Sequence, residues 1–396
     1  MFAELESLPP DPILGVSAAF RADPSPDKID LGVGVYRDEQ GRTPVPAAVK
    51  EAETALLAAQ TTKTYVGPAG NLEFNERIGA LALGPLAAAL ATRIATIQTV
   101  GGCGALRVGA DLVRAANPRA VVHVSDPTWA NHEPLLGNSG LALERYPYYD
   151  GVRHRVDFEQ MLGGIRRLPT GAVVLLHACC HNPTGADLAI EQWTALAEVL
   201  EQRGLLPFVD LAYQGLGDDL ETDAAGLRLV AARVPEMLLA ISCSKNFGLY
   251  RERTGALLVL TGTAGAAATV ATHQARIARR LYSMPPDHGA AIVARVLGDP
   301  QLRARWAAEL AGMVDRIKAL RGLLVDRLAT RRPDLDFRWL LEHRGMFSQL
   351  GVTPSAVREL RERFHVHTPP DGRVNLAGLD GANVDRVADS IVALLG

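Results

Sequence analysis

The stretch GAVVLLHACCHNPTGADLAIEQWTALAEVLEQRGLLPFVDLAYQG, residues 171–215, decides the fold class of this chain. Two short apolar runs, at 171–179 and 205–210, flank an amphipathic segment at 190–204 that ends on a glycine. The helical spacing followed by glycine predicts a helix, and the apolar runs on either side predict strands. Because a strand, a helix and another strand in this order form a parallel pair, we expect a parallel sheet covered by helices.

The same alternation extends over the middle of the chain. Further β-rich runs lie at 120–126, 237–243 and 255–260. After about residue 300 the pattern changes to a long amphipathic helix and then to a shorter α+β region. We therefore expect an α/β protein with a large domain and a smaller α+β domain built from both chain ends. The expected division is an N-terminal arm at 1–10, a small domain from 11–43 and 311–396, and a large domain at 44–310.

Composition argues against several classes of protein. The 41 basic and 44 acidic residues give a net charge of −3, without the basic excess that nucleic-acid binding requires. No run of about 18 uninterrupted apolar residues is present, so we expect no membrane span. The start of the chain is acidic and Pro-rich, unlike a signal peptide, and the four cysteines form no C-x-x-C pair. We therefore expect a cytoplasmic protein with reduced thiols and no metal site.

Polar side chains follow several of the predicted strands, at the point where each strand ends. Taken singly, a carboxylate there is more often a helix cap, and a lysine is more often a solvated end. The helix-cap and solvated-end interpretations are less convincing when all these residues are considered jointly. The carboxyl ends of parallel strands meet at one edge of a sheet, and ligands bind there. The residues that share this position are Trp129, His132, Asn182, Asp210, Tyr213, Ser242, Ser244 and Lys245.

Lys245 is unusual in a chain that nearly always uses arginine. Only five of the 41 basic residues are lysine, and Lys245 is the only lysine between residues 64 and 317. A Gly-rich turn before an amphipathic helix, at 99–117, has the form of an anion-binding loop, although such turns are common. An amine, a carboxylate, an aromatic plate and a phosphate loop together match pyridoxal phosphate, which forms a Schiff base with lysine. Arginine cannot form this imine, and burial near Arg253 would lower the pKa of the lysine.

The chain resembles the class I aspartate/aromatic aminotransferases, which are fold type I pyridoxal-phosphate enzymes. The resemblance covers nearly the whole chain, and the motifs look most like those of the bacterial aromatic branch. Their joint occurrence in order is highly specific. The motifs are IDLGVGVYRDEQGRTPV, TTKTYVGPAG, GGCGALR, SDPTWANH, HACCHNPTG, DLAYQGLG, SCSKNFGLYRERTG, YSMPPDHGA, RGMFS and GRVNLAGL.

This resemblance implies a cofactor role for each matching residue. Lys245 would hold pyridoxal phosphate as a Schiff base and later move a proton between the substrate and the cofactor. Asp210 would pair with the pyridine nitrogen, with His132 behind it. The implied catalytic residues are Lys245, Asp210 and Tyr213. The further contacts implied are Asn182 and Tyr213 on the ring oxygen, Trp129 on the ring face, Gly102, Cys103, Ser242 and Arg253 on the phosphate, and Tyr65 on the phosphate of a neighbouring subunit.

The resemblance also implies how substrates bind. Arg373 would clamp the α-carboxylate, and Arg279 would reach across a subunit interface to a side-chain carboxylate. Because Arg279 and Tyr65 would both act in trans, a homodimer with shared active sites is implied. The substrate-binding residues implied are Gly34, Trp129, Asn182, Arg279 and Arg373.

The implied reaction is ping-pong transamination with 2-oxoglutarate. The implied amino-group donors are the aromatic amino acids tyrosine, phenylalanine and tryptophan, or aspartate, or both of these classes. Cys103 replaces a usual threonine of the aspartate type, and Met284 replaces a common Asn or Ser, both favouring a large or aromatic side chain. His367 replaces a frequent tyrosine. A plain aspartate aminotransferase is the close alternative. A pyridoxal-phosphate lyase or decarboxylase is disfavoured because Arg279 and Arg373 are both retained, and a non-catalytic binding protein is disfavoured because the cofactor residues are intact.

Overall fold

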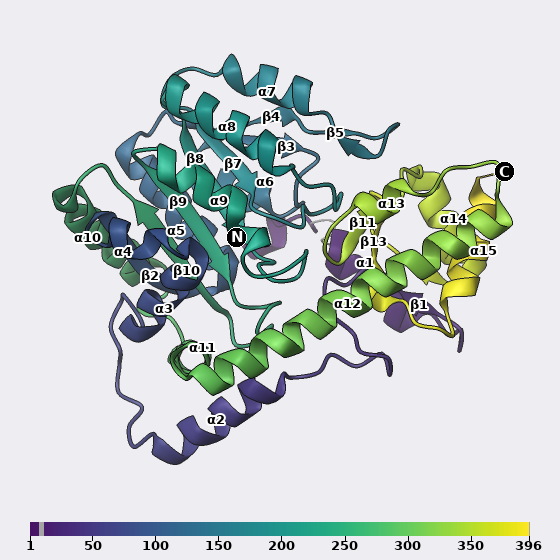
Figure 1. Cartoon of the computed structure of the whole chain (residues 1–396), viewed down its shortest axis with the longest axis horizontal. Helices are drawn as coiled ribbons and strands as arrows, with labels where there is room; N and C mark the ends of the chain where they lie inside the picture. Colours follow the sequence, from purple (N-terminus) through teal and green to yellow (C-terminus); the bar gives the residue numbers. More distant parts are fainter. Residues whose placement is uncertain (8–11, 396) are drawn as a thin grey trace.

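A seven-stranded sheet forms the centre of the computed structural model, which describes residues 1–7 and 12–395 (Figure 1). Neighbouring strands are parallel, except that β10 runs antiparallel to both β2 and β9. The mostly parallel α/β sheet predicted from the sequence is therefore confirmed. In their order across the sheet, the strands are β2 (Ile94–Val100), β10 (Thr254–Leu260), β9 (Met237–Ser242), β8 (Leu206–Leu211), β7 (Val173–His177), β3 (Val121–Asp126) and β4 (Ala142–Pro147).

The βαβ unit predicted at 171–215 consists of β7, α8 (Ile190–Arg203) and β8. The two strands pair in parallel, and the last pair of the register places His177 opposite Asp210. Gly204 ends α8 with a left-handed φ of 59°, which a glycine adopts without strain. The sequence analysis did not identify β2 and β4. Of these, β4 lies at the edge of the sheet with mostly exposed or half-buried residues, so its apolar signal is weak.

Helices cover both faces of the sheet and form two cores with it. Along β7, Val173 and Leu175 belong to one core, whereas Val174 and Leu176 belong to the other, because successive side chains of a strand point to opposite faces. The first core includes α5 (Gly101–Ala116), α6 (His132–Gly137) and α10 (Ala264–Leu281). The second includes α2 (Ala47–Ala59), α3 (Leu72–Leu83), α7 (Phe158–Arg166), α8, α9 (Thr222–Arg233) and α11 (Asp287–Gly298).

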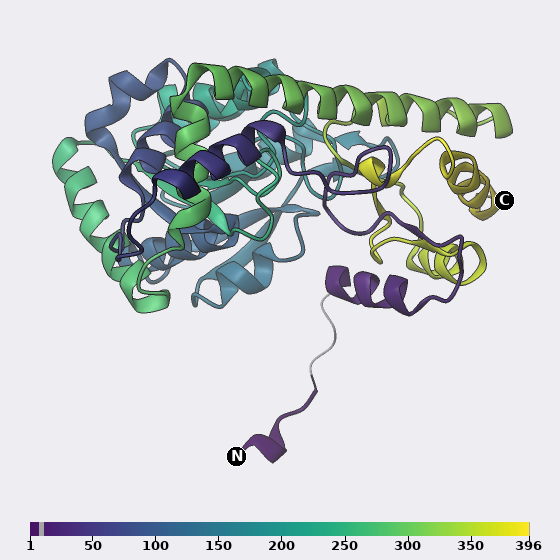
Figure 2. The same ribbon diagram turned by 90° about the horizontal axis from the view of Figure 1, so that it is seen from below.

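The long helix α12 (Pro300–Arg331) connects this sheet with a second, smaller body (Figure 2). Parallel pairing of β1 with β12 ties the beginning of the chain to its end, so the smaller body is built from both ends, as predicted. Its elements are α1 (Pro12–Ala22), β1 (Ile29–Asp30), α13 (Trp339–Glu342), β11 (Phe347–Gln349), α14 (Pro354–Phe364), β12 (Val366–His367), β13 (Arg373–Asn375), η3 (Leu376–Gly378) and α15 (Val384–Leu394).

The exact domain boundaries stay predictions. The predicted boundary at 310/311 falls inside α12, where the apolar side chains change from the core of the large sheet to that of the smaller body between Ile317 and Leu320. We propose that these cores define the two domains. The predicted end of the N-terminal arm, at residue 10, lies outside the described residues. The remaining elements are η1 (Phe2–Glu4), α4 (Leu86–Leu90), η2 (Ala91–Arg93), β5 (Tyr149–Asp150) and β6 (Arg155–Val156).

Among the described helices, none is both long and apolar enough to cross a membrane.

Candidate active site

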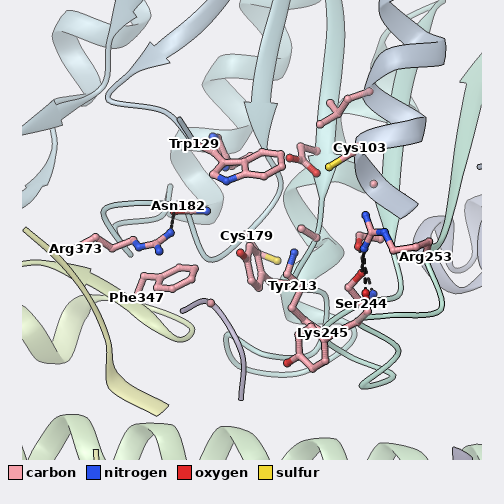
Figure 3. Close-up of a pocket in the computed structure, with 18 residues that line it drawn as sticks. Cys103, Trp129, Cys179, Asn182, Tyr213, Ser244, Lys245, Arg253, Phe347 and Arg373 are labelled. Atoms are coloured by element: carbon pink, nitrogen blue, oxygen red, sulfur yellow. Dashed lines mark hydrogen bonds between the residues drawn. The ribbon is translucent and has the colours of Figure 1, made fainter. Parts of the chain in front are cut away.

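One cavity lies at the carboxyl ends of β3, β7, β8 and β9 and extends to the smaller body (Figure 3). Most of the residues singled out in the sequence line it, although they come from distant parts of the chain. These are Gly34, Gly102, Cys103, Trp129, Asn182, Asp210, Tyr213, Ser242, Ser244, Lys245, Arg253 and Arg373. The lining also contains Leu106, His177, Cys179, Ala212, Tyr250 and Phe347, to which the sequence analysis gave no role.

Lys245 follows β9 in a tight turn that is hydrogen-bonded to the long helix α12. The carbonyl of Asn246 in this turn accepts a hydrogen bond from Nε1 of Trp306 in α12 at 2.8 Å. Nζ of Lys245 lies 4.9 Å from the centre of the Tyr213 ring. Burial lowers the pKa of the amine, and Arg253 adds to this lowering, whereas Asp210 opposes it. The lowered pKa agrees with the sequence-based expectation and favours the neutral, nucleophilic amine.

Asp210 ends β8 and contacts an imidazole behind it. Nε2 of His132, the first residue of α6, lies 3.1 Å from Oδ2 of Asp210. Burial opposes ionisation of Asp210, but the hydrogen bond and charge of His132 outweigh it, so the pKa of the carboxyl is lowered. The network continues from Nδ1 of His132 through the Thr128 hydroxyl, at 2.8 Å, to Nε2 of His177, at 3.1 Å. A buried, ionised carboxylate therefore faces the cavity.

A site for an anion lies where α5 begins. A Cβ atom on Gly101 would stand 2.6 Å from the Arg253 guanidinium, and one on Gly102 would stand 3.0 Å from Cβ of Ser242, so a side chain at either position would crowd this turn. Gly101 also has a left-handed φ of 65°. Among the described residues, Arg253 forms no ion pair and donates only to the carbonyl of Tyr250 and the hydroxyl of Ser244. A helix N-terminus beside a guanidinium that has no ion-pair partner suits a phosphate group.

Arg373 presents a second guanidinium to the same cavity. It donates to Oδ1 of Asn182 at 2.9 Å and to the carbonyl of Gly32 at 2.7 Å, and its Cζ lies 4.2 Å from the centre of the Phe347 ring. The side chain is buried, and within the described ranges its Nε has no hydrogen-bond partner and no carboxylate pairs with it. A buried cation with only neutral acceptors is stabilised by an anionic ligand such as a carboxylate.

These groups fit pyridoxal phosphate. The phosphate group matches the Gly-lined site at Arg253, the aldehyde matches Lys245, and the ring nitrogen matches the Asp210 carboxylate. Trp129, whose ring lines the cavity, offers an aromatic face, while Asn182 and Tyr213 offer an amide and a phenol. The unpaired guanidinium of Arg373 remains for a substrate carboxylate.

Two predicted residues lie outside this cavity in the single chain. Tyr65 has 91% of its surface exposed, and Arg279, at the end of α10, is exposed and contacts the hydroxyl of Ser283. Met284 is half-buried and does not line the cavity, and buried His367 contacts the Asp23 carboxylate instead, at 2.8 Å. The proposed action of Tyr65 and Arg279 on a neighbouring subunit therefore stays a prediction.

Sequence reasoning missed three residues that support the site. Phe347 belongs to the motif RGMFS, but its stacking on Arg373 depends on residues 26 positions apart meeting in space. Thr128 and His177 link to His132 across two strand ends. The available signal was His177 itself, an imidazole at the end of an otherwise apolar strand.

One group outside the predicted set has atoms suited to a metal. The sulfur atoms of Cys179 and Cys180 and a carboxylate oxygen of Asp223 lie within 4.8 Å of one another. However, Asp223 accepts hydrogen bonds from the backbone of Gly215, Gly217 and Asp218, and a hydrogen bond between the side chains of Cys179 and Cys180, together with burial, raises the pKa of the Cys179 thiol. These groups are satisfied as they stand, and we assign no metal to them.

The buried histidine network predicts an acid-sensitive fold. Burial, together with the charge of His132, lowers the pKa of His177 to about 3, from 6.5 in an unfolded chain. The contribution of neutral His177 to the stability of the fold is therefore fully present above pH 6.5 and is lost as the pH falls toward 3. We expect His177→Gln to reduce the pH slope of the unfolding free energy in this window by up to about 1.4 kcal/mol per pH unit, in denaturant titrations. The exposed His273→Gln control should leave the slope unchanged, and equal slopes for all three proteins would contradict the prediction.

The comparisons with known proteins agree with the fold and the site. The model of the family "Aminotransferase class I and II" matches residues 26–391. The aromatic-amino-acid aminotransferase of Paracoccus denitrificans is 47% identical over 392 residues, covering 99% of each chain. The aspartate aminotransferase of Escherichia coli K12 is 43% identical over 396 residues, covering 100% of each. An aromatic-amino-acid aminotransferase from Burkholderia pseudomallei, solved covalently bound to pyridoxal phosphate, superposes with a TM-score of 0.96 at 45% identity over both whole chains.

Fold and site together define a fold type I enzyme that depends on pyridoxal phosphate. The chain belongs to the class I and II aminotransferases, which exchange amino groups between amino acids and 2-oxo acids. The resemblance inferred from the sequence motifs is therefore confirmed, and the alternative of a non-catalytic binding protein is not supported.

Proposed function

We propose that this aminotransferase transfers the amino group of aromatic L-amino acids, and also of aspartate, to 2-oxoglutarate, with pyridoxal phosphate bound to Lys245. One observation carries the proposal: a buried amine with a lowered pKa shares a cavity with an ionised carboxylate and an unpaired guanidinium, those of Asp210 and Arg373. Relatives named for aromatic amino acids and for aspartate support both substrate classes.

Each residue has a definite task in this reaction. The bound cofactor supplies an electron-withdrawing ring that stabilises negative charge at the substrate α-carbon. Arg373 and Asn182 bind the α-carboxylate and orient the α-carbon toward Lys245. Nζ of Lys245, in its neutral form, takes the proton from the substrate α-carbon and returns it to the carbon on the other side of the transferred nitrogen. Asp210, held by His132, keeps a proton on the ring nitrogen.

The order of substrates follows from using one carboxylate site. The first 2-oxo acid must leave Arg373 before the second substrate can bind there, which gives ping-pong kinetics. Water must be available to release the first product.

Preference for aromatic substrates is the finer part of the proposal. Cys103 lines the cavity, and its only described polar contact is a weak one, from Nδ2 of Asn131 at 3.9 Å. A thiol presents a more apolar surface than the hydroxyl usual in aspartate-type members. Arg279 would meet a substrate side-chain carboxylate and swing away from an aromatic ring. A plain aspartate aminotransferase is the alternative, supported by relatives with that name.

We also propose a homodimer with shared sites. The exposed Tyr65, at 91%, lies in the sequence between two other exposed apolar residues, Leu57 at 71% and Leu72 at 70%, which a second subunit would cover. Light scattering should give twice the chain mass of 42.3 kDa, and a monomer would contradict this part. The cytoplasmic location inferred from the sequence stays a prediction.

The visible absorption spectrum of the purified protein tests the proposal. We expect a band of lysine-bound cofactor that phenylalanine or aspartate, added without a 2-oxo acid, converts to the spectrum of the aminated cofactor. Conversion by both amino acids would support dual specificity, and Arg279→Ala should then impair aspartate far more than phenylalanine. Conversion by aspartate alone would favour the alternative. Absence of the band after incubation with pyridoxal phosphate would refute the cofactor assignment.

A further inference from the structure

The Arg373 guanidinium lies over the ring of Phe347, with 4.2 Å between Cζ and the ring centre (Figure 3). The same ring meets Tyr213 edge-on, with the ring centres 5.9 Å apart. On another side, a Cβ atom on Gly34 would stand 3.0 Å from Cζ of Phe347. The position of this ring therefore limits where the guanidinium can lie when it meets a carboxylate.

A buried arginine of α12 holds the backbone around this ring. Arg321 has 3% of its surface exposed and does not line the cavity. Its guanidinium reaches four oxygen atoms in one short segment. These are the carbonyls of Leu340 at 3.1 Å, Gly345 at 2.6 Å and Phe347 at 3.5 Å, and the hydroxyl of Ser348 at 2.5 Å.

The choice of arginine at this buried position is informative. All four acceptors of Arg321 are neutral, and no carboxylate of the described chain forms an ion pair with it. Burial lowers its pKa to about 10, so it still carries a charge at neutral pH. A buried cation without a carboxylate costs stability. A lysine has one nitrogen and could not reach acceptors spread over nine residues, whereas the fork of arginine can.

The held segment is also packed tightly against the large domain. Gly345 has a left-handed φ of 71°, and a Cβ atom there would stand 2.6 Å from Cβ of Cys180. A Cβ atom on Gly185 would stand 2.2 Å from the carbonyl oxygen of Phe347. The loop 180–185 carries the amide that holds Arg373, so both supports of the guanidinium belong to one packed unit.

We propose that Arg321 is a positioning residue for substrate binding, which holds Phe347 against Arg373 and thereby sets the affinity for the substrate α-carboxylate. The inference rests on the proposed role of Arg373 as the carboxylate clamp. Every amino acid and 2-oxo acid substrate carries this carboxylate. Displacement of the Phe347 ring should therefore weaken the binding of both substrates alike and leave the cofactor in place.

Steady-state kinetics of the holoenzyme test this with Arg321→Lys. We expect the KM values for the amino acid and the 2-oxo acid each to rise about 10-fold, with kcat changed less than about 3-fold and the visible cofactor band unchanged. The matched control is Arg331→Lys on the same helix, because Arg331 pairs with Asp385 and Asp389 away from the cavity. This control should keep both KM values.

Hydrogen–deuterium exchange gives a readout independent of activity. Amides of residues 343–348 should exchange faster in Arg321→Lys than in the wild type, and the rest of the cavity should not. If that variant does not fold, Ser348→Ala removes one acceptor of Arg321 and should raise both KM values in the same direction. A double-mutant cycle with Phe347→Leu should show strong non-additivity in KM, because both changes act through one ring.

Two results would overturn the inference. One is a lowered thermal midpoint with both KM values unchanged, which would mean that Arg321 only stabilises the fold. The other is independent, additive effects of Arg321 and Phe347. Failure of the proposed function is distinguishable, since a wild-type protein without a cofactor band or turnover would refute that function, whereas an active wild type with unaffected variants would refute only this inference.

Discussion

Lys245→Ala is expected to lower kcat at least about 10⁴-fold, the largest effect of any single change in this chain. Among the described residues, Lys245 provides the only amine that lines the cavity, so the variant loses both the attachment point of the cofactor and the base for the α-proton. The Lys245→Ala protein should bind pyridoxal phosphate without showing the visible absorption band of the lysine-bound cofactor. Turnover with phenylalanine and aspartate, measured beside the spectrum, checks this.

Two further variants separate the chemistry of Lys245 from its charge. Lys245→Arg keeps a positive charge but cannot lose its proton at working pH, so it should be as inactive as Lys245→Ala. Lys318→Ala removes an exposed lysine that pairs with Asp218, and it should keep full activity. Substantial turnover by Lys245→Arg would show that charge alone suffices and would refute the proton-transfer role.

Asp210→Asn should lower kcat/KM by about 10²- to 10³-fold while the protein still folds and binds the cofactor. The amide has the same shape as the carboxylate, but it lacks the negative charge that stabilises a proton on the ring nitrogen. The lowered pKa of Asp210, caused by His132 against the effect of burial, shows that the fold maintains this charge. Steady-state kinetics with both amino acids measure the loss.

The order of activity among Asp210 variants distinguishes charge from shape. Asp210→Glu keeps the charge but displaces it by one methylene, so it should retain more activity than Asp210→Asn. The opposite order would mean that the size of the side chain matters more than its charge, and the pairing with the ring nitrogen would then be wrong.

Several features of this protein could be predicted from local sequence. The βαβ unit at 171–215 follows from apolar periodicity and from Gly204, because strand and helix periods depend only on near neighbours. Parallel strands end at a common edge, so the positions of Asp210 and Lys245 near each other followed from the pattern. The chemistry of an isolated lysine among arginines then indicated the cofactor.

Other features depend on contacts between residues far apart in the chain, which no local pattern encodes. The antiparallel β10 pairs with both β9 and β2, which lies more than 150 residues earlier, and this pairing places the Gly101 turn beside Arg253.

The support of the substrate clamp shows the same division most clearly. The motif GRVNLAGL indicated a role for Arg373, but the contact of Phe347 with it and the hydrogen bonds from Arg321 to the segment around Phe347 arise from packing between α12 and two short strands. Local sequence therefore specified the elements and the reactive groups, because these follow from the periods and chemistry of near neighbours. The tertiary structure alone decided which buried groups position them, because burial and distance are properties of the packed chain.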